Sequence, residues 1–153
     1  NAIQSYDKAI GLEPQDDGVW DNKGNALRRM ERYEEAIQAY DKALEINPQN
    51  SWTWMHKGYT LYGMERYEEA GQVFDKAIEL NPENYDAWYS KGNSLRMMGK
   101  IDEAIQAYDR SIELNPEHAL TWYNKGIALN QAGNYTEADV SFSKAIELGY
   151  GES

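Results

Sequence analysis

Residues 17–50 read DGVWDNKGNALRRMERYEEAIQAYDKALEINPQN, and the same pattern returns every 34 residues along the chain. The four prolines keep this period at Pro14, Pro48, Pro82 and Pro116, and four tryptophans keep it at Trp20, Trp54, Trp88 and Trp122. A Lys-Gly pair follows each of these tryptophans at the same distance. Several residue types that share one period of this length indicate a chain built from repeated structural units.

The Lys-Gly pair could by itself have a chemical role. Lys23 and Gly24, with Arg28 and Arg29 close behind them, could form the rim of a phosphate site. A phosphate loop is needed once per site, however, whereas this pair occurs once in every repeated unit. The pair is therefore predicted to serve the packing of the repeat.

Each unit is predicted to form two helices. In the first unit, apolar and small residues recur at helical spacing over residues 17–30 and again over residues 34–47. The second segment ends at an Asn-Pro pair, and proline disfavours a helical conformation at the residue before it. Small side chains at Gly24 and Ala36 should let the two helices approach closely around Tyr40.

The motifs W-x-x-K-G-x-x-L, Y-x-x-A-x-x-x-Y-x-x-A and N-P, taken together, resemble the tetratricopeptide repeat family over nearly the whole chain. The resemblance implies an all-α fold, a right-handed superhelical solenoid of helix-turn-helix repeats whose first helices line a concave groove. The expected repeats are residues 17–50, 51–84, 85–118 and 119–152, preceded by the second helix of an incomplete repeat at residues 1–16. The regular Trp-x-x-Lys-Gly pattern resembles prokaryotic arrays, archaeal ones included, and the incomplete repeat suggests a fragment of a longer array.

Two positions depart from the pattern. Gly71 and Asp139 replace the isoleucine that occupies the same place in the other second helices. Glycine lowers helix stability by roughly 0.5–1 kcal/mol relative to alanine, so the repeat at residues 51–84 is expected to be the weakest. Asp139, together with Tyr150 where proline is expected, suggests that the array ends or changes there.

Composition limits the classes of partner. The 153 residues carry a net charge of −11, and the pI is about 4.6. Nucleic acids and anionic lipids both require clustered Lys and Arg, so neither is expected as a partner. No apolar run approaches the roughly 20 residues of a membrane-spanning helix, so membrane insertion is not expected. The absence of cysteine fits a cytoplasmic location.

Catalytic chemistry is not indicated either. The two histidines, His56 and His118, have no nucleophile or metal-ligand companion at local spacing. Acidic pairs such as Glu34-Glu35 stand at the starts of second helices, where negative charge complements the helix dipole. We therefore expect no enzyme activity, no metal site and no cofactor.

The resemblance places the second, fifth, sixth, ninth, twelfth and thirteenth residues of each repeat on the concave side. On these grounds the candidate peptide-binding groove consists of Asn22, Asn25, Arg28, Arg29, Trp52, Met55, His56, Tyr59, Tyr62, Tyr89, Asn93, Arg96, Tyr123 and Asn124. The alternative is that several of the tyrosines simply pack between adjacent first helices.

The chemistry of these positions suits a peptide. Aromatic residues offer rigid contact area, arginine can bind a carboxylate in a fork, and asparagine amides can both donate to and accept from a peptide backbone. His56 and Ser90 would interrupt a continuous row of asparagines. The expected ligand is an extended segment of about nine residues with apolar or aromatic anchors and an acidic group, and a helical ligand is the competing mode.

The sequence thus favours a non-enzymatic protein–protein interaction module that binds a peptide segment of a partner protein. The alternative is a structural scaffold that assembles head-to-tail into a homo-oligomer through the incomplete repeats at its ends.

Overall fold

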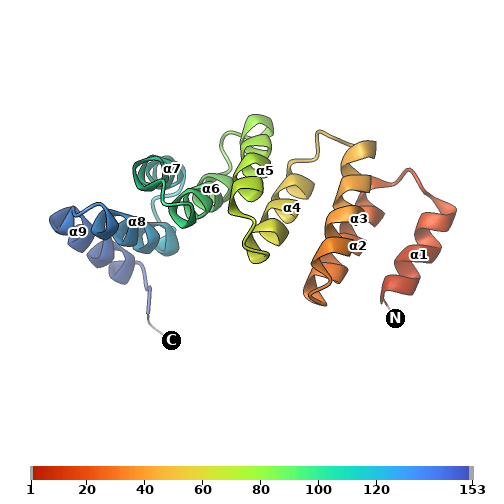
Figure 1. Ribbon diagram of the computed structural model, residues 1–153, viewed down its shortest axis with the longest axis horizontal. Coiled ribbons are helices and arrows are strands. Elements are labelled where there is room, and N and C mark those ends of the chain that lie inside the picture. The colour runs from red at the N-terminus through yellow and green to blue at the C-terminus, as the bar shows by residue number, and fades with distance from the viewer. Residues whose placement is uncertain (1, 152–153) are drawn as a thin grey trace. The chain divides into compact units, whose positions relative to one another are not determined.

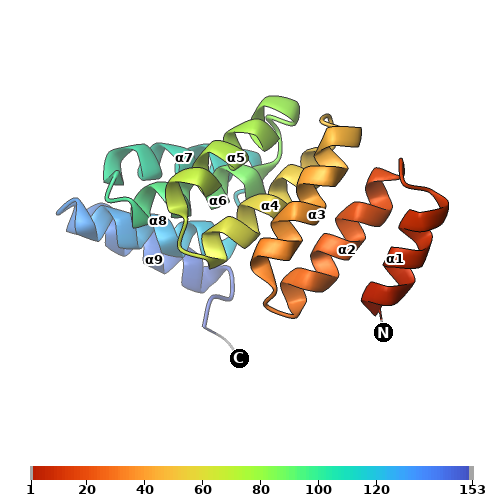
Figure 2. The ribbon, with the colours of Figure 1, turned by 45° about the vertical axis from the view of Figure 1, so that its right-hand side comes forward.

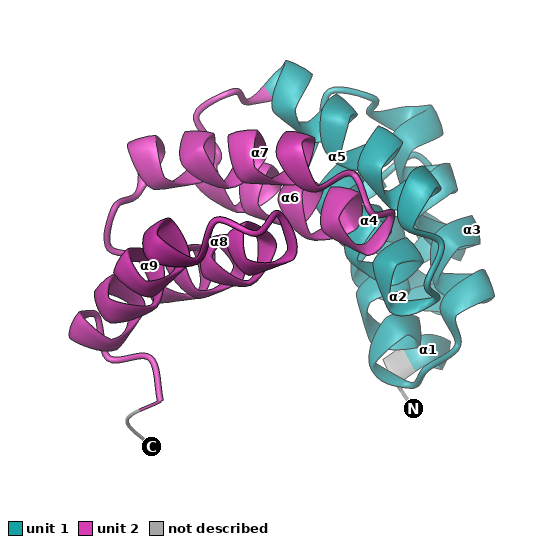
Figure 3. Ribbon diagram, turned by 60° about the vertical axis from the view of Figure 1, so that its left-hand side comes forward, with its two compact units in different colours: residues 1–80 teal, residues 81–153 magenta. Residues whose placement is uncertain are grey.

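The computed structural model describes residues 2–151, and its chain divides into two compact units, Asn1–Leu80 and Asn81–Ser153 (Figures 1 and 3). The first unit contains α1 (Ala2–Leu12), α2 (Asp17–Arg29), α3 (Tyr33–Ile46), α4 (Ser51–Gly63) and α5 (Tyr67–Leu80). The second unit contains α6 (Tyr85–Met97), α7 (Ile101–Leu114), α8 (Ala119–Gln131) and α9 (Tyr135–Glu147). All regular structure in residues 2–151 is helical, which confirms the predicted all-α fold of helix-turn-helix repeats.

The helices pack in consecutive pairs, α2 with α3 and α4 with α5 in the first unit, and α6 with α7 and α8 with α9 in the second (Figures 1 and 2). Each first helix presents a glycine to an aromatic ring of its partner helix. A Cβ atom added at Gly24 would lie 2.5 Å from Cε1 of Tyr40, and one added at Gly92 would lie 2.6 Å from Cε1 of Tyr108. The close approach predicted at Gly24 is therefore confirmed, because only a residue without a side chain fits there.

The lysine of the Lys-Gly pair joins neighbouring helices. Lys23 Nζ lies 2.7 Å from Asp7 Oδ1 of α1, and Lys57 Nζ lies 2.6 Å from Asp41 Oδ1 of α3. Each lysine also lies over the ring of the tryptophan three residues before it, 5.4 Å from the ring centroid for Lys23. The pair therefore makes contacts within the protein, as its repetition predicts.

The tryptophan of each repeat is tied to the preceding turn. The indole Nε1 of Trp20 donates to the carbonyl oxygen of Pro14 at 3.1 Å, and the same bond recurs at 2.9 Å from Trp54 to Pro48. The periodic Trp and Pro are thus two ends of one hydrogen bond. Repetition of this bond accounts for the repeated tryptophan, since only its indole N–H supplies the donor.

Candidate functional site

In the first unit the predicted groove residues lie on α2 and α4, and their exposure differs widely. Trp52 is 62% exposed and Arg29 is also exposed. Met55 is fully buried, so its side chain does not reach the surface and its assignment to the groove needs correction. Met55 was assigned to the groove by its place in the repeat. Its burial depends on the neighbouring helices, which that place alone does not specify. The remaining residues of the set are Asn22, which is exposed, and Asn25, Arg28, His56, Tyr59 and Tyr62, which are half-buried.

A polar network joins α2, α3 and α4. His56 Nδ1 lies 3.0 Å from Asp21 Oδ1, and Asn25 Nδ2 donates to Asp21 Oδ2 at 3.0 Å. The Tyr40 hydroxyl donates to Asn25 Oδ1 at 3.1 Å, and burial raises the pKa of this hydroxyl. Both ends of the Asn25 amide are therefore engaged within the protein, and the residue contributes less to a ligand surface than its chemistry suggests.

The second unit contributes Tyr89, Asn93 and Arg96 from α6, and Tyr123 and Asn124 from α8. The Tyr108 hydroxyl donates to Asn93 Oδ1 at 2.8 Å, which repeats the Tyr40–Asn25 bond of the first unit. Asn124 Nδ2 donates to the Tyr89 hydroxyl at 3.2 Å. The second unit therefore brings Tyr89 and Asn124 together, and it commits one end of Asn93 to the protein.

His118 lies among the aromatic rings of this unit. Its ring packs edge-on against Tyr89 with centroids 5.1 Å apart, and a similar distance separates it from Tyr85. His118 Nδ1 lies 2.7 Å from the hydroxyl of Thr121, and burial lowers the pKa of His118. The histidine is therefore a packing residue beside the predicted surface, and nothing in its spacing along the sequence indicates these ring contacts.

Every predicted groove tyrosine makes a ring contact within its own unit. Tyr59 packs on Phe74 with centroids 5.7 Å apart, Tyr62 on Tyr67 at 5.1 Å, Tyr89 on Tyr108 at 6.3 Å and Tyr123 on Phe142 at 5.6 Å. Each of these partner rings lies on the second helix of the same repeat, so these contacts differ from the predicted packing between adjacent first helices. Contact with the fold and contact with a ligand can use different faces of one ring, so the two roles remain compatible.

Tyr150 is an aromatic neighbour that the sequence reasoning missed. Its ring stacks on Tyr123 with centroids 4.0 Å apart and planes inclined by 22°. The neighbouring hydroxyl of Tyr123, together with burial, raises the pKa of Tyr150. The one feature of the sequence that pointed to Tyr150 is its position, where the earlier repeats have proline.

The arginines of α2 and α6 share an unusual feature. The Nε atom of Arg28 and that of Arg96 are buried, and neither has a hydrogen-bond partner in the described part of the chain. Both residues lie in the last turn of a first helix, where positive charge interacts favourably with the helix dipole. A carboxylate that reaches either guanidinium would form a charge-assisted hydrogen bond.

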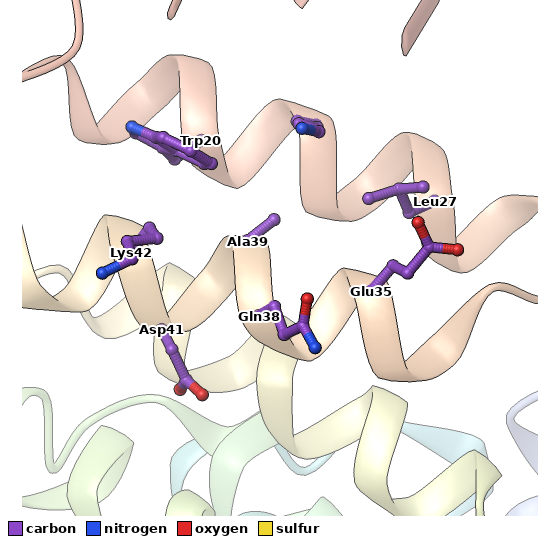
Figure 4. Close-up of a pocket in the computed structure, with 8 residues that line it drawn as sticks. Trp20, Leu27, Glu35, Gln38, Ala39, Asp41 and Lys42 are labelled. Atoms are coloured by element: carbon purple, nitrogen blue, oxygen red, sulfur yellow. The ribbon is translucent and has the colours of Figure 1, made fainter. Parts of the chain in front are cut away.

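A pocket of about 420 Å³ lies between α2 and α3 (Figure 4), and none of its lining residues belongs to the predicted groove. Its lining residues are Trp20, Lys23, Leu27, Glu35, Gln38, Ala39, Asp41 and Lys42. A pocket of about 350 Å³ in the second unit is lined at equivalent places by Trp122, Val140 and Lys144. Recurrence at the same places of two repeats indicates a gap in the repeat packing. We therefore do not assign a ligand to it.

Residues 2–151 hold no group of three or more His, Asp or Glu side chains placed to bind a metal ion. None of the described helices combines the length and the apolar character that crossing a membrane requires.

Comparison with known proteins identifies the repeat. A model of the tetratricopeptide repeat matches residues 20–50, 51–84 and 85–118, and a second model of the same repeat matches residues 107–139. No curated protein matches the chain.

Solved structures with the same fold include a crystal structure of MamA, which is 24% identical with a TM-score of 0.91, over 98% of this chain and 88% of that one. MamA from Desulfovibrio magneticus RS-1 is 21% identical with a TM-score of 0.91, over 99% of this chain and 85% of that one. These likenesses show the shared fold. Since the matched repeat segments make up more than half of the sequence, the chain belongs to the tetratricopeptide repeat family.

Proposed function

We propose that the chain is a protein–protein interaction module whose first helices bind a peptide segment of a partner. Family and fold both support an interaction module. The observation that carries the peptide proposal is the exposure of apolar side chains on first helices. Trp52 on α4 is 62% exposed, Met97 on α6 is 43% exposed and Leu120 on α8 is 44% exposed. All three occupy places in the repeat that the family resemblance assigns to the groove.

Charge supports an acidic group in the ligand. The last turn of α2 carries Arg28 and Arg29, and that of α6 carries Arg96. Second helices instead begin with acidic residues, such as Glu34 and Glu35 in α3. A peptide with an apolar anchor and a carboxylate would therefore meet complementary chemistry on the first helices.

Trp52→Ala tests this proposal. Exposed tryptophan is a frequent source of binding energy in interfaces, so peptides selected from a random display library on the native chain should lose about tenfold or more in affinity. The matched control is Val140→Ala, which removes a side chain that is 64% exposed on a second helix and should leave affinity unchanged. Titrations by fluorescence anisotropy measure both. Equal affinity of all three proteins for every selected peptide would refute the assignment.

A second candidate function is assembly of copies of the chain, supported by an apolar face of α9. Tyr135 is 67% exposed and Ile146 is 60% exposed, and they stand about three helical turns apart on one side of the helix. Leu44, which holds the place of Ile146 in α3, is 7% exposed. A residue that is buried in an interior repeat is thus uncovered in α9, and a second copy is the occupant we assign to it.

Ile146→Glu tests the assembly. A buried charge at a contact between copies is strongly unfavourable, so the substitution should abolish any increase of mass with concentration. Sedimentation velocity over a range of protein concentrations measures this, with Met30→Glu as a control at an exposed site away from both ends of the chain. A native chain that stays monomeric at all concentrations, or a mass increase that survives Ile146→Glu, would exclude assembly through α9.

A further inference from the structure

The helix α9 ends differently from α7, which is the second helix of the preceding repeat in the same unit. At the end of α7 the N–H of Asn115 donates to the carbonyl of Ser111, and Pro116 follows. At the end of α9 the N–H of Gly149 donates to Ile146 and the N–H of Tyr150 donates to Ala145, both at 2.9 Å. These two bonds define a Schellman motif, which needs a donor where the earlier repeats have proline. The tyrosine thus makes a different turn available.

Gly149 sets the direction of this turn. Its φ of +90° lies in the region that side chains rarely adopt, and glycine reaches it without steric cost. The turn brings the Tyr150 ring onto the ring of Tyr123 on α8, with centroids 4.0 Å apart. Tyr123 is one of the predicted groove residues, so residues of the chain itself cover part of the predicted ligand surface.

The contact shows which chemical group this surface accepts. The two rings are stacked, with planes inclined by only 22°. Phe142 packs on the Tyr123 ring as well, with centroids 5.6 Å apart. The Tyr123 ring thus packs against Phe142 of α9, and the Tyr150 ring stacks on it.

We propose that Tyr123 is the anchoring position for an aromatic side chain of the partner peptide, and that Tyr150 occupies this position in the unbound chain. The inference rests on the proposed function and names the ligand group for the second unit. Binding then requires exchange of one aromatic ring for another. A stacked tyrosine of the same chain lowers the apparent affinity by competing for the site, and aromatic contacts of this kind correspond to a factor of roughly three to ten.

The test is a selection from a random-peptide display library on the Tyr150→Ala protein. Selected peptides that compete with one another should carry Phe, Tyr or Trp at a fixed place. Their affinity should be roughly three to ten times higher for Tyr150→Ala than for the native chain. The peptide affinity of the double variant Tyr123→Ala, Tyr150→Ala should be lower than that of Tyr150→Ala. Tyr150→Phe retains the stacking ring and should bind almost as weakly as the native chain.

Val140→Ala is the control, since it removes another exposed side chain of α9, one that is 64% exposed. Circular dichroism checks that every variant keeps its helix content. Selected peptides without a shared aromatic residue, or affinities unaffected by Tyr150→Ala, would overturn the inference. If such peptides still depend on Trp52, the proposed function stands and only the aromatic anchor is excluded. Loss of dependence on both residues would reject the two together.

Discussion

Gly58→Ala should lower the free energy of unfolding by about 1–3 kcal/mol, although alanine is the better helix former. Gly58 lies within α4, and a Cβ atom added there would sit 2.5 Å from Cε1 of Phe74, well inside van der Waals contact. Phe74 is only 1% exposed, so its ring has little room to withdraw. The cost of overpacking should therefore exceed the gain in helix propensity.

The matched control lies in the same helix. Gly63 ends α4, and a Cβ atom added there would meet nothing within 4 Å. Gly63→Ala should therefore leave the unfolding free energy unchanged or raise it by up to about 1 kcal/mol through helix propensity. Urea unfolding followed by circular dichroism measures both variants. If Gly58→Ala also stabilises the protein, the glycine is not needed for close packing and the structural explanation of the Lys-Gly motif is wrong.

The glycine contacts were predictable because they lie within one repeat. A period of 34 residues locates Gly24 and Tyr40 on facing helices, and helix packing then requires one of the two to be small. The lysine contacts were harder to predict from the sequence. Asp7 and Asp41 pair with Lys23 and Lys57 of the following first helix. Such pairs depend on how neighbouring repeats stack, and a local pattern contains no such distance.

The same limit applies to the candidate site. The register identified surface positions such as Trp52 correctly as first-helix residues, but it could not show that Met55 is fully buried. It also could not show that Tyr150 stacks on Tyr123, because that contact depends on the turn after α9. Asparagine at the ninth place of a repeat suggested a ligand-binding amide. The structure gives Asn25 and Asn93 a partner within the protein instead.

The four repeats alternate in a way that explains these asparagines. Where the second helix carries a buried tyrosine, Tyr40 or Tyr108, the first helix carries an asparagine whose Oδ1 accepts a hydrogen bond from the tyrosine hydroxyl. The two other repeats pair a phenylalanine with a residue that is not asparagine, namely Phe74 with Tyr59, and Phe142 with Ile127. Phenylalanine has no hydroxyl to satisfy. The asparagine and the tyrosine are therefore expected to depend on each other energetically.

Asn93→Ile should consequently cost about 1–3 kcal/mol of unfolding free energy, because it removes the acceptor of a hydrogen bond from a fully buried residue. Adding Tyr108→Phe should recover most of this loss, since the fourth repeat already places isoleucine and phenylalanine at these two positions. Tyr108→Phe alone should cost about 0.5–1.5 kcal/mol. The double-mutant cycle should then show a coupling of at least about 0.5 kcal/mol.

Urea unfolding of the native chain, both single variants and the double variant measures the four corners of this cycle. Coupling would mean that Asn93 is present chiefly to satisfy Tyr108, and that a ligand in the second unit depends on Tyr123 and Arg96 more than on this amide. Strictly additive losses would mean that the hydrogen bond contributes little to stability. In that case Asn93 would regain its place as a ligand-binding residue, because its Oδ1 could leave Tyr108 for a peptide N–H at almost no cost.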